Sequence, residues 1–271
     1  MDTRPSPIER LMQTLSPADT GPPAAPAPGP PEYLPFAFPG VPSVGCAFTF
    51  APAGTFSISL APDAAAAAAA AANRKRLLGR LGLERWVEMY QVHGDVLLLD
   101  PAPTPVDRAS EIRADGSCTR RPGLALLIKT ADCQPILLAN RQGTAIAALH
   151  AGWRGNAMNF PGTGLARFCE AYSLDPADAL AVRGPSLGPG AAEFVNFHRE
   201  WPLEFTPWFD QQRRLMDLWS LTRHQLIDAG MRSENIFALD LCTHSLPELL
   251  FSHRRGHKGR QASVIWIKQD S

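Results

Sequence analysis

The stretch from Gly123 to Gly155 limits what this chain can fold into more than any other part of it. Two apolar runs rich in Leu, Ile and Ala lie within it and predict buried strands. TADC (130–133) follows the first run, and HAGWRG (150–155) follows the next. A thiol and an imidazole at the ends of core strands indicate a functional site. Neither would do so alone, because a buried cysteine usually acts as a small hydrophobe and a lone histidine is usually hydrogen-bonded within a core.

Strand and helix patterns alternate along most of the chain. Strands are predicted at 44–51, 55–60, 86–90, 96–99, 179–183, 236–241 and 262–267, and helices at 64–81, 162–172, 217–229 and 246–251. Many strands are apolar on both faces, and hairpin-length spacings near Ala51 and Leu97 indicate antiparallel neighbours. We therefore predict an α+β fold, a layered sandwich in which a mixed β-sheet is covered by helices. Residues 1–43, rich in Pro and Ala, are expected to form an arm, and 44–271 a single catalytic domain.

The composition excludes several classes of protein. Lys+Arg and Asp+Glu both total 26, so no basic surface field is expected to attract nucleic acid. Five widely spaced cysteines argue against a disulfide framework and for a reducing compartment. The polar start of the chain does not resemble an export signal, and no apolar run reaches the roughly 18 residues of a membrane span. We expect a cytoplasmic monomer or homodimer that binds neither nucleic acid nor membranes.

Three residues that can bind a metal lie at the ends of predicted strands. They are His93, Cys133 and His150. Strand ends at one edge of a sheet lie close together even when they are far apart in sequence. Two imidazoles and a thiolate suit zinc, and three protein ligands leave a position for water or substrate, which is the catalytic pattern. Their separations of 40 and 17 residues match no compact zinc finger, so spacing alone does not decide the site.

Several short motifs occur in one order along the chain. They are QVHG (91–94), ADG (114–116), TADC (130–133), HAGWRG (150–155), RGPSLGPG (183–190), DLCT (240–243), and FSHRRG with GRQAS (251–263). Together they resemble the YfiH-like family, also called laccase-domain or multicopper polyphenol oxidase proteins and peptidoglycan editing factors. The resemblance covers about residues 44–268, and the joint occurrence of TADC and HAGWRG makes it specific.

The resemblance implies a YfiH/CNF1-like fold and a zinc-dependent purine nucleoside phosphorylase. The expected substrates are phosphate with adenosine, inosine or methylthioadenosine, and adenosine deaminase activity is also implied. The family's metal ligands fall on His93, Cys133 and His150. Copper is expected there only as an adventitious substitute. A multicopper laccase would need on the order of ten imidazoles. This chain has seven histidines and no His-x-His pair, so laccase activity is not expected.

The resemblance also implies roles for the residues around the metal. Cys133, His150, Asp132 and Arg154 are the expected catalytic residues, and Arg154, Arg254, Arg255 and Thr130 are the expected phosphate-binding and substrate-binding residues. A guanidinium matches the oxygens of phosphate, whereas we interpret Lys258 and Arg260 as a solvated basic loop. Asp115 is expected to carry a proton, to support the site or to cap a turn. Phe50 and Ser59 stand where the family has polar residues at the rim of its cavity.

Two other functions fit the same residues. Cys133 could act as a nucleophile with His150 as its base, which would make the protein a cysteine hydrolase or amidase that edits peptidoglycan fragments. Alternatively, the chain could be a non-catalytic relative in which zinc only stabilises a binding module.

Overall fold

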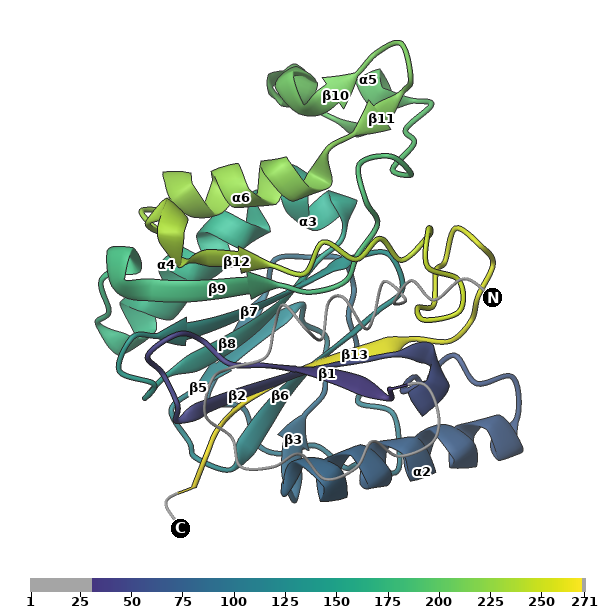
Figure 1. Ribbon diagram of the computed structural model, residues 1–271, viewed down its shortest axis with the longest axis vertical. Coiled ribbons are helices and arrows are strands. Elements are labelled where there is room, and N and C mark those ends of the chain that lie inside the picture. Colours follow the sequence, from purple (N-terminus) through teal and green to yellow (C-terminus); the bar gives the residue numbers. More distant parts are fainter. Residues whose placement is uncertain (1–30, 270–271) are drawn as a thin grey trace, which may run out of the picture. The chain divides into compact units, whose positions relative to one another are not determined.

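Two β-sheets lie face to face at the centre of the folded chain (Figure 1). The computed structural model describes residues 31–269. In spatial order the first sheet contains β1 (Tyr33–Phe36), β2 (Val44–Thr49), β13 (Gln261–Ile267), β6 (Leu124–Thr130) and β3 (Arg85–Val87). The second contains β12 (Ile236–Ala238), β9 (Ala179–Arg183), β7 (Gln134–Asn140), β8 (Ile146–Ala151), β5 (Gly116–Thr119) and β4 (Leu97–Leu99). Both sheets are mixed, since β3–β6, β4–β5 and β9–β12 are parallel pairs and the remaining pairs are antiparallel.

Helices cover the outer face of each sheet. On the first sheet, α2 (Ala64–Leu81) packs Leu77 and Leu78 against Trp86 and the residues of β6 and β13 that face the helix. On the second, α4 (Phe160–Tyr172) and α6 (Leu218–Asp228) pack against β7, β8 and β9. The result is an α/β/β/α sandwich, which confirms the layered α+β prediction, although the sequence had suggested one sheet rather than two.

Shorter elements surround the sandwich. They are α3 (Trp153–Ala157), α5 (Phe197–Glu200), the β10–β11 hairpin (Phe209–Asp210 and Leu215–Met216) and 3-10 turns at Ala51–Ala53, Pro176–Asp178, Leu203–Trp208 and Ser233–Asn235. An aromatic cluster around Phe197 and Trp201 packs α5 and the hairpin against α6. None of the helices in the described part of the chain is long and apolar enough to cross a membrane.

The alanine-rich helix has the bounds that the sequence predicts. Asp63 caps its start by accepting a hydrogen bond from the Ala66 N–H at 2.8 Å. Gly82 ends it in the left-handed conformation with φ 66°, which favours glycine. Local signals therefore determine this element, since the helix needs only good helix formers between two caps.

Several predicted elements differ from the structure at the N-terminal side. The run 55–60 is not a strand, because the two edges of β2 are taken by β1 and β13. The regular structure also begins before residue 44, because β1 pairs with β2 despite the prolines near it. Residues 1–30, most of the expected arm, lie outside the described residues, as do 270–271.

Further along, the stretch from Gly123 to Gly155 contains three strands rather than two. β6 belongs to the first sheet, whereas β7 and β8 belong to the second, so TADC is the crossover between the sheets. The helix predicted at 246–251 is a series of turns, and β5 was not predicted as a strand.

Candidate metal centre and cavity

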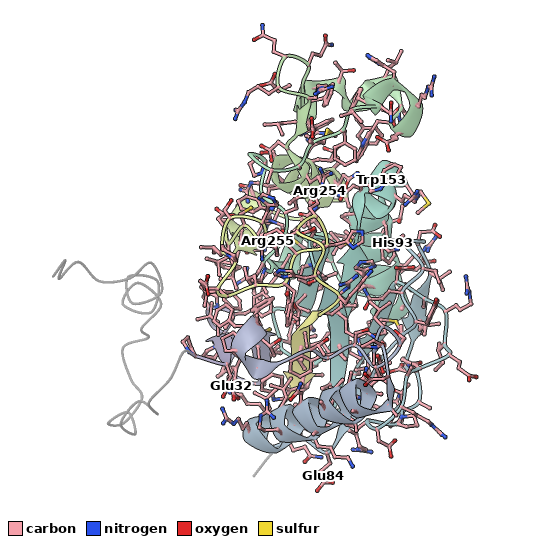
Figure 2. The ribbon with its side chains drawn as sticks, turned by 90° about the vertical axis from the view of Figure 1, so that its right-hand side faces the viewer. Glu32, Glu84, His93, Trp153, Arg254 and Arg255 are labelled. Carbon is pink, nitrogen blue, oxygen red and sulfur yellow. The ribbon has the colours of Figure 1, made fainter. Side chains whose placement is uncertain are left out.

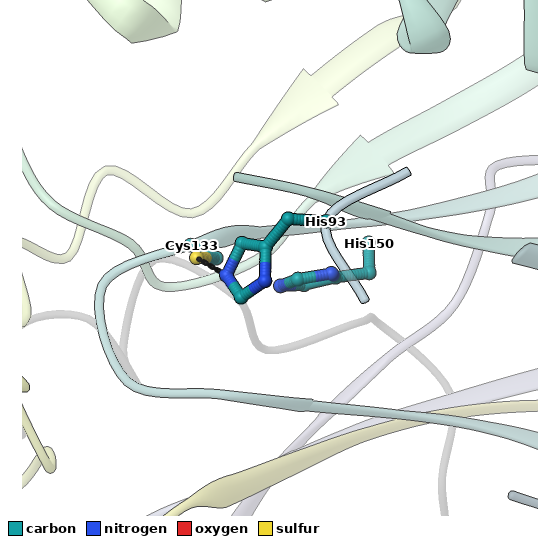
Figure 3. A group of neighbouring side chains, drawn as sticks. All are labelled: His93, Cys133 and His150. Carbon is teal, nitrogen blue, oxygen red and sulfur yellow. Dashed lines mark hydrogen bonds between the residues drawn. The ribbon is translucent and has the colours of Figure 1, made fainter. Parts of the chain in front are cut away.

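The side chains of His93, Cys133 and His150 come together in the folded chain (Figure 3). One ligand atom from each lies within 4.8 Å of the others. The Cys133 Sγ is 3.7 Å from His93 Nε2, and the two imidazole rings have their centroids 4.9 Å apart at 74°. Ligands held about 2.0–2.3 Å from a tetrahedral ion lie roughly 3.3–3.8 Å from one another. The donor types and their separations therefore fit a metal ion.

The loop that carries His93 is tied to both sheets. Gln91 makes two hydrogen bonds to the Lys129 backbone, at 2.8 and 2.9 Å, which align the loop with β6. His93 itself has φ 60°, a conformation that non-glycine residues adopt only when their surroundings hold them there. Gly152 lies close to this loop, because a Cβ there would come within 2.7 Å of the His93 ring.

Asp115 holds both the loop and one imidazole. Its carboxylate accepts the backbone N–H groups of Val92, His93 and Gly94 at 3.2, 2.9 and 2.7 Å, and it contacts His150 Nδ1 at 2.8 Å. Burial raises the pKa of Asp115, but these contacts, with His150 foremost, outweigh it and leave the pKa below its usual value. The His150 Nε2 is thereby left to face the other two ligands, as in carboxylate–histidine–metal arrangements.

The thiol and the imidazole also change each other's charge. Burial raises the pKa of Cys133, but the attraction of His150 and the hydrogen bonds from both histidines lower it to about 6. Burial likewise lowers the pKa of His150, yet the Cys133 thiolate and Asp115 raise it to about 9. Without a metal, Cys133 and His150 therefore form a thiolate–imidazolium pair at neutral pH.

A cavity of about 530 Å³ opens over the three ligands. One part of its wall is polar and comes from the first sheet and the segment after β2, namely Ser57, Ser59, Lys129 and Arg260. Another part is aromatic and apolar, namely Trp153, Phe194 and Leu218. A molecule with one anionic and one flat apolar part would match this lining.

The structure brings most of the predicted site residues to this cavity. Cys133, His150, Thr130, Arg154 and Arg254 all line it. The Arg154 guanidinium stacks 4.4 Å from the centre of the Trp153 ring, while Arg254 lies over Phe194 and donates to the Glu193 carbonyl at 2.7 Å. Figure 2 shows Trp153 and Arg254 near one another above His93. The Thr130 hydroxyl is buried and has no partner among the described residues.

Asp132 lines the cavity, but its carboxylate is occupied. It accepts the Thr243 hydroxyl at 2.6 Å and the Arg254 backbone N–H at 2.8 Å. These bonds tie the TADC crossover to two C-terminal loops. The backbone of Asp132 has φ 93°, an angle that non-glycine residues rarely adopt. The geometry therefore favours a structural role for Asp132 over proton transfer.

Arg255 is the predicted site residue that the structure does not bring into the cavity. Its guanidinium donates to the carbonyls of Thr243, His244 and Leu250 and so braces the C-terminal loops. Phe50, expected at the rim, is 2% exposed and packs in the core. Ser59, by contrast, does line the cavity.

Lys129 was not singled out from the sequence, and the interpretation of Arg260 as part of a solvated loop was wrong, since both cations line the cavity. Lys129 had a visible signal, because a lysine inside the buried run LALLIKT needs a partner or a function. Arg260 had none, since nothing near it in sequence distinguishes it from its basic neighbours.

Comparison with known proteins decides the family. Residues 55–268 match the family model described as multi-copper polyphenol oxidoreductase laccase. The chain belongs to this family. Its relatives include purine nucleoside phosphorylase YfiH of Escherichia coli, which is 39% identical over 206 residues and covers 72% of this chain and 79% of the relative. A purine nucleoside phosphorylase of Xylella fastidiosa is 37% identical over 213 residues, which is 72% of this chain and 77% of that protein.

Solved structures of family members have the same fold. The Neisseria meningitidis protein NMB0706 superposes with a TM-score of 0.74 at 25% identity, covering 88% of this chain and all of its own. YlmD of Geobacillus stearothermophilus superposes with a TM-score of 0.73 at 25% identity, covering 85% of this chain and 94% of its own. The family and the His2Cys cluster together indicate a metal cofactor.

Proposed function

We propose that this family member is a zinc-dependent purine nucleoside phosphorylase. The observation that carries the proposal is the His93–Cys133–His150 cluster beneath a cavity with a cationic and an aromatic wall, in a chain up to 39% identical to proteins of that name. The substrates would be phosphate and a purine nucleoside such as adenosine, inosine or methylthioadenosine.

Zinc suits the donor set better than copper does. Two imidazoles and one thiolate supply three ligands to zinc. The fourth position is then open for water or substrate, which is the usual arrangement of catalytic zinc. A multicopper centre needs many more imidazoles, and the described part of the chain offers one cluster of this kind, with three residues. When bound, zinc would supply Lewis acidity at the floor of the cavity.

The chain's own residues would bind and orient the two substrates. Trp153 and Phe194, whose rings are 6.0 Å apart, offer flat apolar surfaces for a purine base. Cationic side chains of the wall would hold phosphate, whose oxygen forms a bond to C1′ of the sugar as the bond from C1′ to the base breaks. The base leaves with the bonding electron pair and takes up a proton. Arg154 and Arg254 lie over the rings of Trp153 and Phe194, beside the surfaces that would take the base.

Metal analysis and product identification test the proposal. The purified protein should contain about one zinc per chain. With inosine or adenosine it should release hypoxanthine or adenine and ribose 1-phosphate only when phosphate is present. Conversion of adenosine to inosine would reveal the deaminase activity in the same chromatograms. A metal-free protein that releases no base from any of these nucleosides would refute the proposal.

A cysteine hydrolase is the second candidate, and the thiolate–imidazolium pair of Cys133 and His150 favours it. In that reaction class the thiolate would attack an acyl carbon and the amine would leave with a proton from His150. An acylating probe that labels Cys133 at the same rate with and without chelator, in an active enzyme, would support the hydrolase. Protection of the thiol by metal would support the phosphorylase.

A further inference from the structure

Lys129 places a positive charge in a buried part of the cavity wall. It lies in β6, and its side chain is 10% exposed. Its ammonium contacts the carboxylate of Glu88, which is fully buried. Arg74, also fully buried, already binds both oxygens of Glu88, at 2.6 and 2.8 Å. Two cations therefore share one carboxylate, and the group keeps a net positive charge where burial of an uncompensated charge is costly.

Arg260 adds a second cation at the same end of the cavity. The register pairs Gln261 with Thr130 and Ala262 with Lys129, so Arg260 leaves β13 directly beside the end of β6. Its Nη1 donates to the carbonyls of residues 257, 258 and 259, which fixes the guanidinium. Its Nε and Nη2 make no hydrogen bond within the described part of the chain, and the side chain lines the cavity.

Two serine hydroxyls complete this end of the wall. Ser57 and Ser59 line the cavity with their Oγ atoms 3.4 Å apart. The segment that carries them is fastened to Arg260 and to Arg74, which binds Glu88 together with Lys129. The Phe56 N–H donates to the Arg260 carbonyl at 3.0 Å, and the Phe56 carbonyl accepts Arg74 Nε at 2.9 Å. The two serines and the two cations are thus parts of one connected arrangement.

The geometry points to a phosphate subsite formed by Lys129, Arg260 and the hydroxyls of Ser57 and Ser59. Two cations and two hydroxyl donors match the charge and the acceptor oxygens of phosphate. Arg154 and Arg254 stack on the rings of the aromatic part of the lining, where they would flank the base rather than hold the phosphate. The role of this phosphate as co-substrate rests on the proposed function. Binding of the anion itself does not.

Titration with inorganic phosphate alone tests the subsite. The zinc-loaded full chain is compared with Lys129→Met, Arg260→Gln and Arg154→Ala by calorimetry. Lys129→Met and Arg260→Gln should each weaken phosphate binding by about ten- to a hundredfold, the size of one charge-assisted hydrogen bond. Arg154→Ala should change it by less than about threefold. In turnover, the same two variants should raise the KM for phosphate and leave the KM for the nucleoside within about twofold.

Two further variants serve as controls. Lys75→Met removes an exposed lysine of α2 and should bind phosphate as the unmodified chain does. Lys129→Arg keeps the charge and should recover most of the phosphate binding. This control separates the loss of charge from a loss of stability if Lys129→Met lowers the melting temperature. No phosphate binding by the unmodified chain, or loss of binding in Arg154→Ala alone, would overturn the subsite. Phosphate binding that depends on Lys129 and Arg260 without any nucleoside turnover would refute the proposed function and leave the subsite standing.

Discussion

At the scale of single residues, Asp115 links two parts of the metal site. The sequence left open whether it supports the site or caps a turn, and the structure shows that one carboxylate does both. Its three backbone hydrogen bonds set the conformation of the loop that carries His93, and its contact with Nδ1 orients His150. Two of the three ligands therefore depend on one side chain.

Asp115→Asn should weaken metal binding while leaving all three ligands in place. An amide cannot match a carboxylate that accepts three N–H groups and also pairs with the imidazole, so we expect the metal affinity to fall about 10–100-fold. Competition with a chromophoric chelator measures this affinity. Asp107→Asn, at an exposed aspartate, is the matched control and should have no effect. Equal affinities in the two variants would mean that Asp115 does not support the metal.

The reactivity of Cys133 should report its lowered pKa. In the metal-free protein the pKa of about 6 means that the thiolate form predominates at pH 7 and is lost as the pH falls through 6. Alkylation by iodoacetamide should therefore follow a titration near pH 6, whereas an ordinary thiol titrates near about 8.5. Mass spectrometry of labelled peptides distinguishes Cys133 from Cys242, the other partly exposed cysteine.

Zinc should protect Cys133 from the reagent, and chelation should restore labelling. Cys133→Ala provides the background rate. A titration near the ordinary thiol value in the metal-free protein would contradict the close pairing of Cys133 with His150 seen in the structure.

At the scale of elements, a buried amide network joins β7 to α3 and α6. Gln134, directly after Cys133, donates through Nε2 to Asn156 Oδ1, the Leu218 carbonyl and Thr222 Oγ1 at 3.1, 3.2 and 2.8 Å. Asn156 in turn bonds Thr222 and Gln225 at 2.8 and 3.0 Å. Since α3 begins at Trp153, the network holds the aromatic wall of the cavity at a set position relative to Cys133.

Gln134→Leu should destabilise the protein because it leaves buried polar partners unsatisfied. We expect a loss of about 1–3 kcal/mol in the free energy of unfolding. Urea denaturation measures it, with Gln211→Leu at an exposed site as the control, where the change should stay within about 0.5 kcal/mol. A loss no larger than that of the control would show that leucine packing replaces the network.

At the scale of the whole described chain, the metal site lies where the two sheets exchange strands. The His93 loop runs from β3 of the first sheet to β4 of the second, and Cys133 lies on the crossover from β6 to β7. His150 comes from β8, within the second sheet. A metal bound to all three would therefore cross-link segments that are far apart in sequence.

Removal of the metal should lower the melting temperature of the whole domain. A metal present at about 100 times its dissociation constant adds roughly 2.7 kcal/mol, which corresponds to about 5–10 °C in a domain of this size. Calorimetry with and without chelator measures the shift. Cys133→Ala should melt at a lower temperature that responds neither to metal nor to chelator. A chelator-induced shift of equal size in Cys133→Ala would place the stabilising metal elsewhere.

The sequence by itself determined the features that depend on residues close together in the chain. The α2 helix has its predicted bounds because its helix formers and both caps lie within one segment. The three candidate ligands could be selected because each follows an apolar run, and a strand end limits where a side chain can lie. The alternation of strands and helices likewise limited the fold to a layered α+β sandwich.

Only the tertiary structure decided which strands pair and which cations face the cavity. β2 had two edges, and pairing with β1 and β13 rather than with 55–60 depended on contacts across more than two hundred residues. Arg255 and Arg260 are five residues apart and similar in sequence context. Surrounding carbonyls bind both terminal nitrogens of Arg255, whereas Arg260 makes its hydrogen bonds within the described chain through Nη1 alone. The physical reason is that a charged side chain's role depends on the partners within reach of it, and those partners are assembled by the fold.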